Sequence, residues 1–202
     1  MGKVIKDFII KNRSCRRYHQ NRAVRLETLK ELVDLARLSA SAANLQPLRY
    51  ILVCDAHINA KIFPCLGWAG YLTHWPGPEE GERPPAYIVI LGDTGIAKDF
   101  GCDLGIAGQS ILLGAIEKGL AGCMIGSINR KKLQNILNIR PQHEILLVVA
   151  VGEPKESIVL DKVGSEGSIR YWRDAAGVHH VPKRSLKDLI VGCYEPGNQL
   201  HS

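Results

Sequence analysis

The chain has 202 residues, of which 46% are hydrophobic and 23% charged, a composition that is ordinary for a folded globular protein. The formal net charge of +6 mildly favours an anionic partner, but the chain contains no nucleic-acid-reading motif and few aromatics among its basic residues, which disfavours nucleic acid. No apolar run reaches membrane-spanning length, so we expect no membrane partner.

The predicted elements begin with two amphipathic helices. In "VIKDFIIKNR", residues 4–13, four apolar residues fall on one helical stripe. In "RLETLKELVDLARLSA", residues 25–40, the i, i+3, i+4, i+7 spacing of a core-facing helix is followed by Leu29, Leu32, Val33 and Ala36. Both segments are therefore predicted to be helical.

Two β-branched runs come next, "RYILVC" at 49–54 and "AYIVILG" at 86–92, and both read as buried strands. Residues 64–85 between them are crowded with proline and glycine and predict a loop. The loop also carries tryptophans and a tyrosine, and such aromatics either pack back on the core or cover a pocket.

In the second half, residues 103–120 predict a long helix that is apolar nearly all round. This pattern is typical of a helix that is buried on every side. In a chain this short, a second subunit is a candidate to cover one of those sides. Residues 121–127 and 144–154 then read as strands, with a helix over 129–137 between them. The alternation of helices and strands predicts an α/β or α+β fold.

The six cysteines show neither a C-x-x-C pair nor a histidine at zinc-ligand spacing. Cys54 and Cys123 lie in the apolar strand-like runs, which favours buried free thiols in a reducing compartment. The N-terminal segment lacks the apolar core of a secretion signal. We therefore expect a cytoplasmic protein without a metal site.

Several familiar catalytic signatures are missing from the sequence. It contains no G-x-x-x-x-G-K-[ST] phosphate loop, no G-x-G-x-x-G after a strand, no G-x-S-x-G elbow and no H-E-x-x-H. No nucleophile stands beside a partnered base. Their absence favours chemistry carried by a bound cofactor.

Three polar segments remain as candidates for binding that cofactor. The first is "RSCRRY" at 13–18, whose guanidiniums suit bidentate recognition of phosphate with help from the Ser14 hydroxyl. A solvated basic face after a helix explains this segment about equally well.

The second segment is "SAANLQP" at 41–47. Ser41, Asn44 and Gln46 offer donors and acceptors that suit the edge of a planar heterocycle. Taken alone, a helix-ending turn is the better interpretation.

The third segment is "HHVPKRSLKDL" at 179–189. It sets Lys183 and Arg184 before a capping box formed by Ser185 and Asp188. Such a segment binds a phosphate or simply exposes a basic helix.

Taken together and in this order, the segments resemble the nitroreductase-like flavoprotein family. Its R-S-x-R-x-[FY] string matches at 13–18, and its S-A-x-N-x-Q-P string matches at 41–47. "GLAGCMIGSI" after the central helix is similar to the family's glycine-rich strand end, and "VHHVPKR" to its basic C-terminal signature. The resemblance runs from about residue 5 to about residue 190.

This resemblance implies an α+β fold with a central, mostly antiparallel sheet flanked by helices, in an intertwined homodimer. It implies a single FMN-binding domain over 1–190, followed by a polar tail at 191–202. One FMN would lie in each of two pockets at the dimer interface. NADH or NADPH would deliver a hydride to it, and small nitroaromatic or quinone-like acceptors would remove it.

The resemblance also assigns roles to particular residues. Gly126 and Ser127 align with the loop whose backbone N–H approaches the flavin N5. Asn44 and its neighbours Ser41 and Gln46 would reach the flavin of the partner's pocket. The phosphate and ribityl group of FMN would be held by residues from both ends of the protein: Arg13, Ser14 and Arg16 near the N-terminus, and Lys183 and Arg184 near the C-terminus. Cys15 and Arg17 lie in the same loop as the first three.

The chain departs from the family pattern at Ala40, where the family often has proline, and at Leu48, where it often has tryptophan. The short segment between the first two strands leaves the substrate open. Reductive dehalogenation, flavin fragmentation and non-enzymatic flavin binding stay as alternatives to nitroreductase chemistry.

Overall fold

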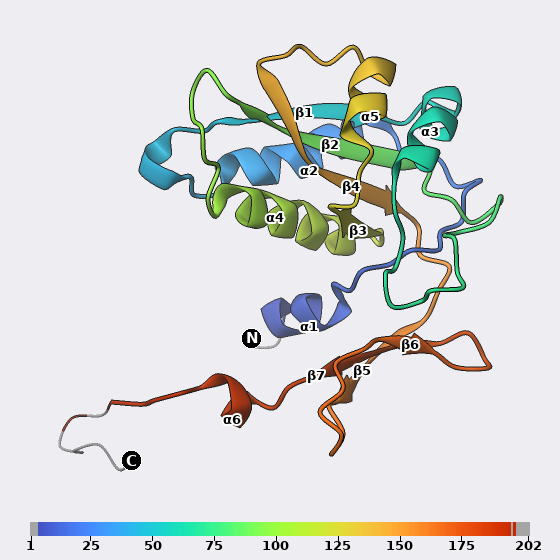
Figure 1. The fold of residues 1–202 in the computed structure, drawn as a ribbon, viewed down its shortest axis with the longest axis vertical. Helices are drawn as coiled ribbons and strands as arrows, with labels where there is room; N and C mark the ends of the chain where they lie inside the picture. The colour runs from blue at the N-terminus through green and yellow to red at the C-terminus, as the bar shows by residue number, and fades with distance from the viewer. Residues whose placement is uncertain (1–3, 195, 197–202) are drawn as a thin grey trace. The chain divides into compact units, whose positions relative to one another are not determined.

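The computed structural model describes residues 4–194 and residue 196. The chain forms two compact units, Met1–Glu156 and Ser157–Ser202, each of which is described by itself (Figure 1). Within the described residues, no helix combines the length and apolarity needed to cross a bilayer.

The predicted single domain over 1–190 is not tested by this division and stays a prediction. Of the tail predicted at 191–202, only residues 191–194 and 196 are among the described residues, and the rest lies outside them.

The first unit is built on a four-stranded antiparallel sheet with strand order β1-β2-β4-β3. The strands are β1 (Leu48–Val53), β2 (Ala86–Asp93), β3 (Ala121–Ile125) and β4 (His143–Gly152). All four lie where the β-branched and apolar runs predict them. The antiparallel pairing confirms the α+β class.

Helices α2 (Leu26–Leu38) and α4 (Asp103–Glu117) pack against each other and against one face of the sheet (Figure 1). Leu29, Leu32 and Ile111 are fully buried in this core, together with alternate residues of β2 and β4. Because successive strand residues point to opposite faces, Tyr87 and Val89 of β2 belong to the other face.

The long helix α4 ends earlier than the predicted residue 120, because Gly119 adopts a left-handed φ of +72° that breaks the helix. Its small residues permit close packing: a Cβ on Gly114 would lie 2.3 Å from Leu35 of α2. Burial on every side is not complete within the single chain, since Ile106 is 36% exposed.

Helix α1 (Val4–Lys11) forms as predicted, but none of its residues is buried. Ile5 is 77% exposed and Val4 is 58% exposed. The apolar stripe read from the sequence is therefore uncovered in the single chain.

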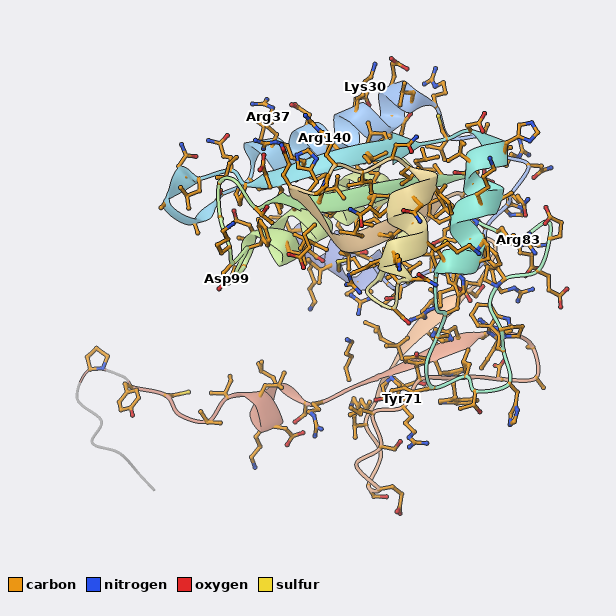
Figure 2. All side chains as sticks on the ribbon, turned by 45° about the horizontal axis from the view of Figure 1, so that its top comes forward. Lys30, Arg37, Tyr71, Arg83, Asp99 and Arg140 are labelled. Carbon is orange, nitrogen blue, oxygen red and sulfur yellow. The ribbon has the colours of Figure 1, made fainter. Side chains whose placement is uncertain are left out.

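Helix α3 (Ala56–Ile62), which was not predicted, continues into the 3-10 turn η2 (Phe63–Cys65). Helix α5 (Arg130–Ile136) lies inside its predicted range. The loop that follows η2 packs inward in part, since the ring of Trp68 stacks on Phe63 with centroids 5.7 Å apart. The tyrosine of this loop, Tyr71, is exposed (Figure 2).

The second unit contains a three-stranded sheet in the order β5-β7-β6. Strands β5 (Ile158–Lys162) and β7 (His179–Lys183) are parallel, and β6 (Trp172–Arg173) is antiparallel to β7. These strands were not predicted from the sequence. Helix α6 (Leu186–Leu189) begins with the predicted capping box of Ser185 and Asp188.

Candidate functional site

Residues 13–17, which we call the arginine loop, run beside strand β3. Ser14 forms a parallel bridge with Gly122, and the Cys15 N–H donates to the Gly122 carbonyl at 3.0 Å. Gly122 itself admits no side chain, because a Cβ there would lie 2.5 Å from the Ala150 carbonyl oxygen of β4. The arginine loop is held beside this glycine of "GLAGCMIGSI" by backbone contacts.

Cys15 points into the protein and Ser14 is exposed. The Cys15 thiol donates to the Arg17 carbonyl at 3.3 Å, and burial raises its pKa. The thiol is therefore protonated and held inside, and the predicted contact of Cys15 with a cofactor stays a prediction.

Arg13 is the partly buried cation of this loop. Its Nη2 donates to the Ile9 carbonyl at 2.7 Å, while its Nε is buried and has no hydrogen-bond partner among the residues that the structure describes. Burial lowers the pKa of Arg13. A buried N–H on a cation without a partner is the kind of group that an anionic ligand would satisfy.

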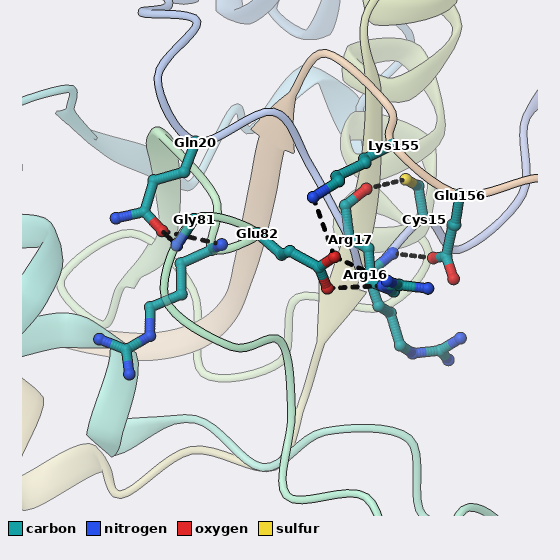
Figure 3. A network of polar contacts seen from close by, with 9 residues as sticks. Cys15, Arg16, Arg17, Gln20, Gly81, Glu82, Lys155 and Glu156 are labelled. Carbon is teal, nitrogen blue, oxygen red and sulfur yellow. Dashed lines mark hydrogen bonds and ion pairs between the residues drawn. The ribbon is translucent and has the colours of Figure 1, made fainter. Parts of the chain in front are cut away.

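Arg17 is held by a carboxylate of the same unit. Its Nε and Nη2 donate to the two Glu82 oxygens at 2.6 Å each, and Lys155 Nζ lies 3.1 Å from the same carboxylate (Figure 3). The guanidinium is thus engaged bidentately. Its predicted contact with a cofactor stays a prediction, and its structural role is to fix the arginine loop.

Arg16 is anchored through its backbone. Its N–H donates to the Glu156 carboxylate (Figure 3). Its Nη1 donates to the Ser14 carbonyl at 3.2 Å. The side chain is only partly buried. Arg16 therefore presents a cation from a fixed backbone position.

Gly126 and Ser127 follow β3 directly, and both are exposed. The Gly67 N–H donates to the Ser127 carbonyl at 2.8 Å, which fixes the backbone there. Strand β3 thus connects the arginine loop, beside Gly122, with this exposed turn. The structure brings these two predicted segments onto one strand.

Residues 41–46, which we call the amide loop, are fastened to the start of α4. The Ser41 hydroxyl donates to Asp103 at 2.6 Å, and the Ala42 N–H donates to the other Asp103 oxygen at 2.9 Å. The Gln46 N–H in turn donates to the Ser41 oxygen at 2.9 Å. The predicted ligand-facing hydroxyl of Ser41 thus has a structural role in the single chain.

The backbone of the amide loop is strained. Ala43, Asn44 and Gln46 have φ of 48°, 54° and 51°, a left-handed conformation that non-glycine residues rarely adopt. The side chains of Asn44 and Gln46 are exposed, and Gln46 Nε2 donates to Asn44 Oδ1 at 3.1 Å. The two predicted amides are therefore presented together at the surface.

The amide loop and the arginine loop lie toward opposite ends of the sheet. Leu48, which follows the amide loop, pairs with Gly92 of β2, and Gly92 pairs in turn with Glu144 of β4. Gly122, beside the arginine loop, pairs with Val151 of β4. Seven residues of strand separate those β4 positions, which corresponds to roughly 23 Å. One chain thus does not bring the two predicted segments together.

Lys183 is the last residue of β7, and Arg184 follows it. Both are exposed, and α6 after them has four residues. They belong to the second unit, and their predicted part in binding a phosphate stays a prediction.

Sequence reasoning missed the carboxylates that hold these loops: Glu82, Asp103 and Glu156. Asp103 is an acidic residue in the first turn of α4, which the helix dipole alone would explain, so nothing in the sequence indicates that it also holds the amide loop. Glu82 and Glu156 act through partners 65 and 140 residues away in the sequence, and no local pattern marks such pairs.

The model of the nitroreductase family matches residues 9–69 and 79–153, well over half of the chain. No curated protein matches. Solved structures with the same fold include the FMN-dependent nitroreductase of Clostridium difficile R20291, at 24% identity, TM-score 0.62 and coverage of 74% of this chain and 87% of that one.

Another is the Bacteroides thetaiotaomicron VPI-5482 protein assigned as an NADH dehydrogenase/NAD(P)H nitroreductase, at 20% identity, TM-score 0.65 and coverage of 78% and 90%. A nitroreductase family protein of Clostridium novyi NT has 23% identity, TM-score 0.63 and coverage of 74% and 86%. Identities this low show the fold alone. The family match and the fold lead to the same conclusion: this chain belongs to the nitroreductase family.

Proposed function

We propose that this protein is an FMN-dependent oxidoreductase that passes a hydride from NADH or NADPH to nitroaromatic, quinone or similar acceptors. The observation that carries the proposal is the buried Nε of Arg13 without a partner, on a loop that β3 holds beside Gly126 and Ser127. The family match and the shared fold with an FMN-dependent nitroreductase support it.

The residues of the arginine loop fit the phosphate of FMN. Arg13 and Arg16 supply two cations, and Ser14 supplies an exposed hydroxyl between them. A phosphate at Arg13 would offset the cost of burying that guanidinium, which is the cause of its lowered pKa. We propose Lys183 and Arg184 as further cations for the same anion.

When bound, FMN supplies the redox chemistry by accepting a hydride at N5 and giving it to the acceptor. The backbone of Gly126 and Ser127 would orient the ring at that atom. An exposed turn at Gly126 leaves room for donor and acceptor to occupy one face in succession, and solvent supplies the proton to the acceptor.

A second copy of the chain would complete each pocket. The separation of roughly 23 Å along the sheet between the amide loop and the arginine loop supports their acting on two different pockets. Asn44 and Gln46, exposed and paired with each other, would then meet the flavin of the partner subunit.

Turnover tests this proposal. Purified protein with added FMN should oxidise NADH or NADPH with a nitroarene or a quinone as acceptor, and oxidation should be far slower without acceptor under anaerobic conditions. Reduction of bound flavin without turnover of either acceptor would favour the same fold with another chemistry, such as dehalogenation. Absence of flavin reduction by either nucleotide would leave a flavin-binding protein that is not an enzyme.

A further inference from the structure

Asp103 is a buried carboxylate that none of the sequence motifs includes. It lies in the first turn of α4 and is 5% exposed. Among the described residues, its oxygens accept hydrogen bonds from the amide loop and pair with no cation. Burying a carboxylate costs free energy that hydrogen bonds must offset. Asp103 is therefore stable at this position because it is bonded to the amide loop at the start of a helix.

Both oxygens of Asp103 are used by the amide loop, which lies beside the beginning of α4 (Figure 1). Oδ2 accepts from the Ser41 hydroxyl at 2.6 Å, and Oδ1 accepts from the Ala42 N–H at 2.9 Å. A carboxylate offers two acceptor oxygens side by side, whereas a side-chain amide offers one. The carboxylate is thus matched to two donors that are adjacent in the loop.

The hydrogen bonds of Asp103 continue through Ser41 to the two exposed amides. The Ser41 oxygen accepts from the Gln46 backbone N–H at 2.9 Å, so the same hydroxyl group donates and accepts. Gln46 Nε2 in turn donates to Asn44 O and to Asn44 Oδ1, at 3.1 Å each. A change at Asp103 therefore reaches Asn44 and Gln46 along a continuous series of hydrogen bonds.

Packing contributes little to the position of the amide loop. Residues 42–46 are all exposed, and a cavity of about 150 Å³ is lined by Ser41 and Gln46 together with Asp103. Three residues of the loop have the left-handed φ described above, a conformation that persists only where the surroundings enforce it. The hydrogen bonds to Asp103 are the contacts that enforce it at the first residues of the loop.

We propose that Asp103 is a positioning residue of the flavin site, which holds Asn44 and Gln46 in the arrangement that meets the ring of the partner subunit's flavin. This role rests on the proposed function and requires no contact between Asp103 and the flavin. Because FMN and riboflavin carry the same ring, a change at Asp103 affects both, whereas a change at Arg13 affects FMN alone.

The hold of Asp103 on the loop can be measured without flavin. Asp103→Asn keeps the size of the side chain and leaves one acceptor oxygen in place of two. The N–H groups of Ala42 and Gln46 should then exchange hydrogen for deuterium faster, as measured by mass spectrometry of the peptide that contains them. Unchanged exchange of this peptide in Asp103→Asn would overturn the proposal.

The matched control is Asp99→Asn, the same substitution just before α4 (Figure 2). Asp99 also accepts from a backbone N–H, that of Gly101 at 3.0 Å, but it is exposed and makes its bond outside the amide loop. Its substitution should leave the exchange of the amide-loop peptide unchanged. Equally fast exchange in both variants would show that the effect is not specific to Asp103 and would overturn the proposal.

Flavin binding measures the consequence for the site. Asp103→Asn should weaken the affinities for FMN and riboflavin by the same factor, about threefold to tenfold. At saturating FMN the visible absorption bands of the bound flavin should also shift, because they respond to hydrogen bonds at the ring, and a loss of stability alone would not move them. Unchanged affinities, unshifted bands or a loss confined to FMN would overturn the proposal. Wild-type protein that takes up neither flavin would overturn the proposed function, and this role of Asp103 with it.

Ser41→Ala is the second variant, and it stays informative if Asp103→Asn does not fold. It cuts the same series of hydrogen bonds from the loop side and leaves Asp103 its bond to Ala42. It should weaken FMN and riboflavin equally, and the losses of the two substitutions should be less than additive when they are combined. Fully additive losses would show that Asp103 does not act through Ser41.

Discussion

Arg13 is the residue on which the proposed phosphate site depends most. Charge-assisted hydrogen bonds of this kind contribute about 1.5 to 3 kcal/mol each. Arg13→Ala should therefore weaken FMN affinity about tenfold to a hundredfold, with little change for riboflavin, which lacks the phosphate. Arg13→Lys should recover only part of the loss, because an ammonium does not match the planar guanidinium.

Titration of apo-protein with FMN and with riboflavin measures both affinities. Arg22→Ala is the matched control, since it removes an exposed arginine from the same N-terminal segment. Equal losses for both ligands in Arg13→Ala would mean that Arg13 supports the fold or the ring instead of the phosphate.

Glu82 makes the stability of the arginine loop depend on acid. The hydrogen bonds from Arg17, with help from Lys155, lower the pKa of Glu82 from 4.5 to about 2. The stabilisation is therefore complete above the ordinary pKa and is lost as the pH falls from about 4.5 to about 2.

Glu82→Gln should accordingly be less stable than the wild type near neutral pH, and the difference in free energy of unfolding should shrink across that acid window. Urea unfolding at several pH values measures it. A difference that stays constant down to the lowest pH would show that the Glu82 charge does not stabilise the loop.

The polar residues of the proposed site could be picked out from the sequence, because the arginines and the Asn–Gln pair occur in recognisable strings. The different contacts that each of them makes could not be predicted. Arg17 and Arg13 look alike in "RSCRRY", yet only the folded chain brings Glu82 to Arg17 and leaves Arg13 Nε unpaired.

Among the elements, the amide loop stores backbone strain that a single substitution can relieve. Ala43 has a φ of 48°, where a Cβ is unfavourable. Ala43→Gly should raise the free energy of unfolding by roughly 0.5 to 1 kcal/mol.

The matched control is Ala42→Gly. Because the φ of Ala42 is not left-handed, this substitution relieves no strain and should lower the free energy of unfolding by a similar amount. Thermal unfolding of both variants compares them. Destabilisation by both substitutions to the same extent would show that Ala43 carries no strain.

The strength of the local pattern decided which elements could be predicted. The strands of the first sheet are buried runs of β-branched residues, and α2 shows clean helical spacing, so both are visible in the sequence. Strand β5 is short and largely exposed, and it pairs in parallel with a strand about twenty residues later, so its signal lies in tertiary pairing.

For the whole molecule, the uncovered apolar surface supports a homodimer. Ile5 of α1 is 77% exposed, and Ile106 of α4 is 36% exposed. We predict that the protein is dimeric at micromolar concentration and that FMN is retained only by the dimer. Light scattering coupled to size exclusion, with absorbance of the bound flavin, measures both. A flavin-loaded monomer would contradict this prediction.

The family and the fold class of the whole molecule could be predicted because three motifs occur in the right order over most of the chain. The separation of a second unit after Glu156 could not, because nothing in the composition changes there. The acceptor is also not readable from sequence, since the family model leaves residues 70–78 of the loop between β1 and β2 unmatched.

The central claim, that bound FMN is reduced by a nicotinamide nucleotide, is tested most directly by the visible spectrum of the purified protein. The protein should be yellow, or become so with added FMN, at one flavin per chain. Anaerobic NADH or NADPH should bleach the flavin absorbance, and a nitroarene or quinone should restore it. A colourless protein that takes up no FMN, or bound flavin that neither nucleotide bleaches, would contradict the account.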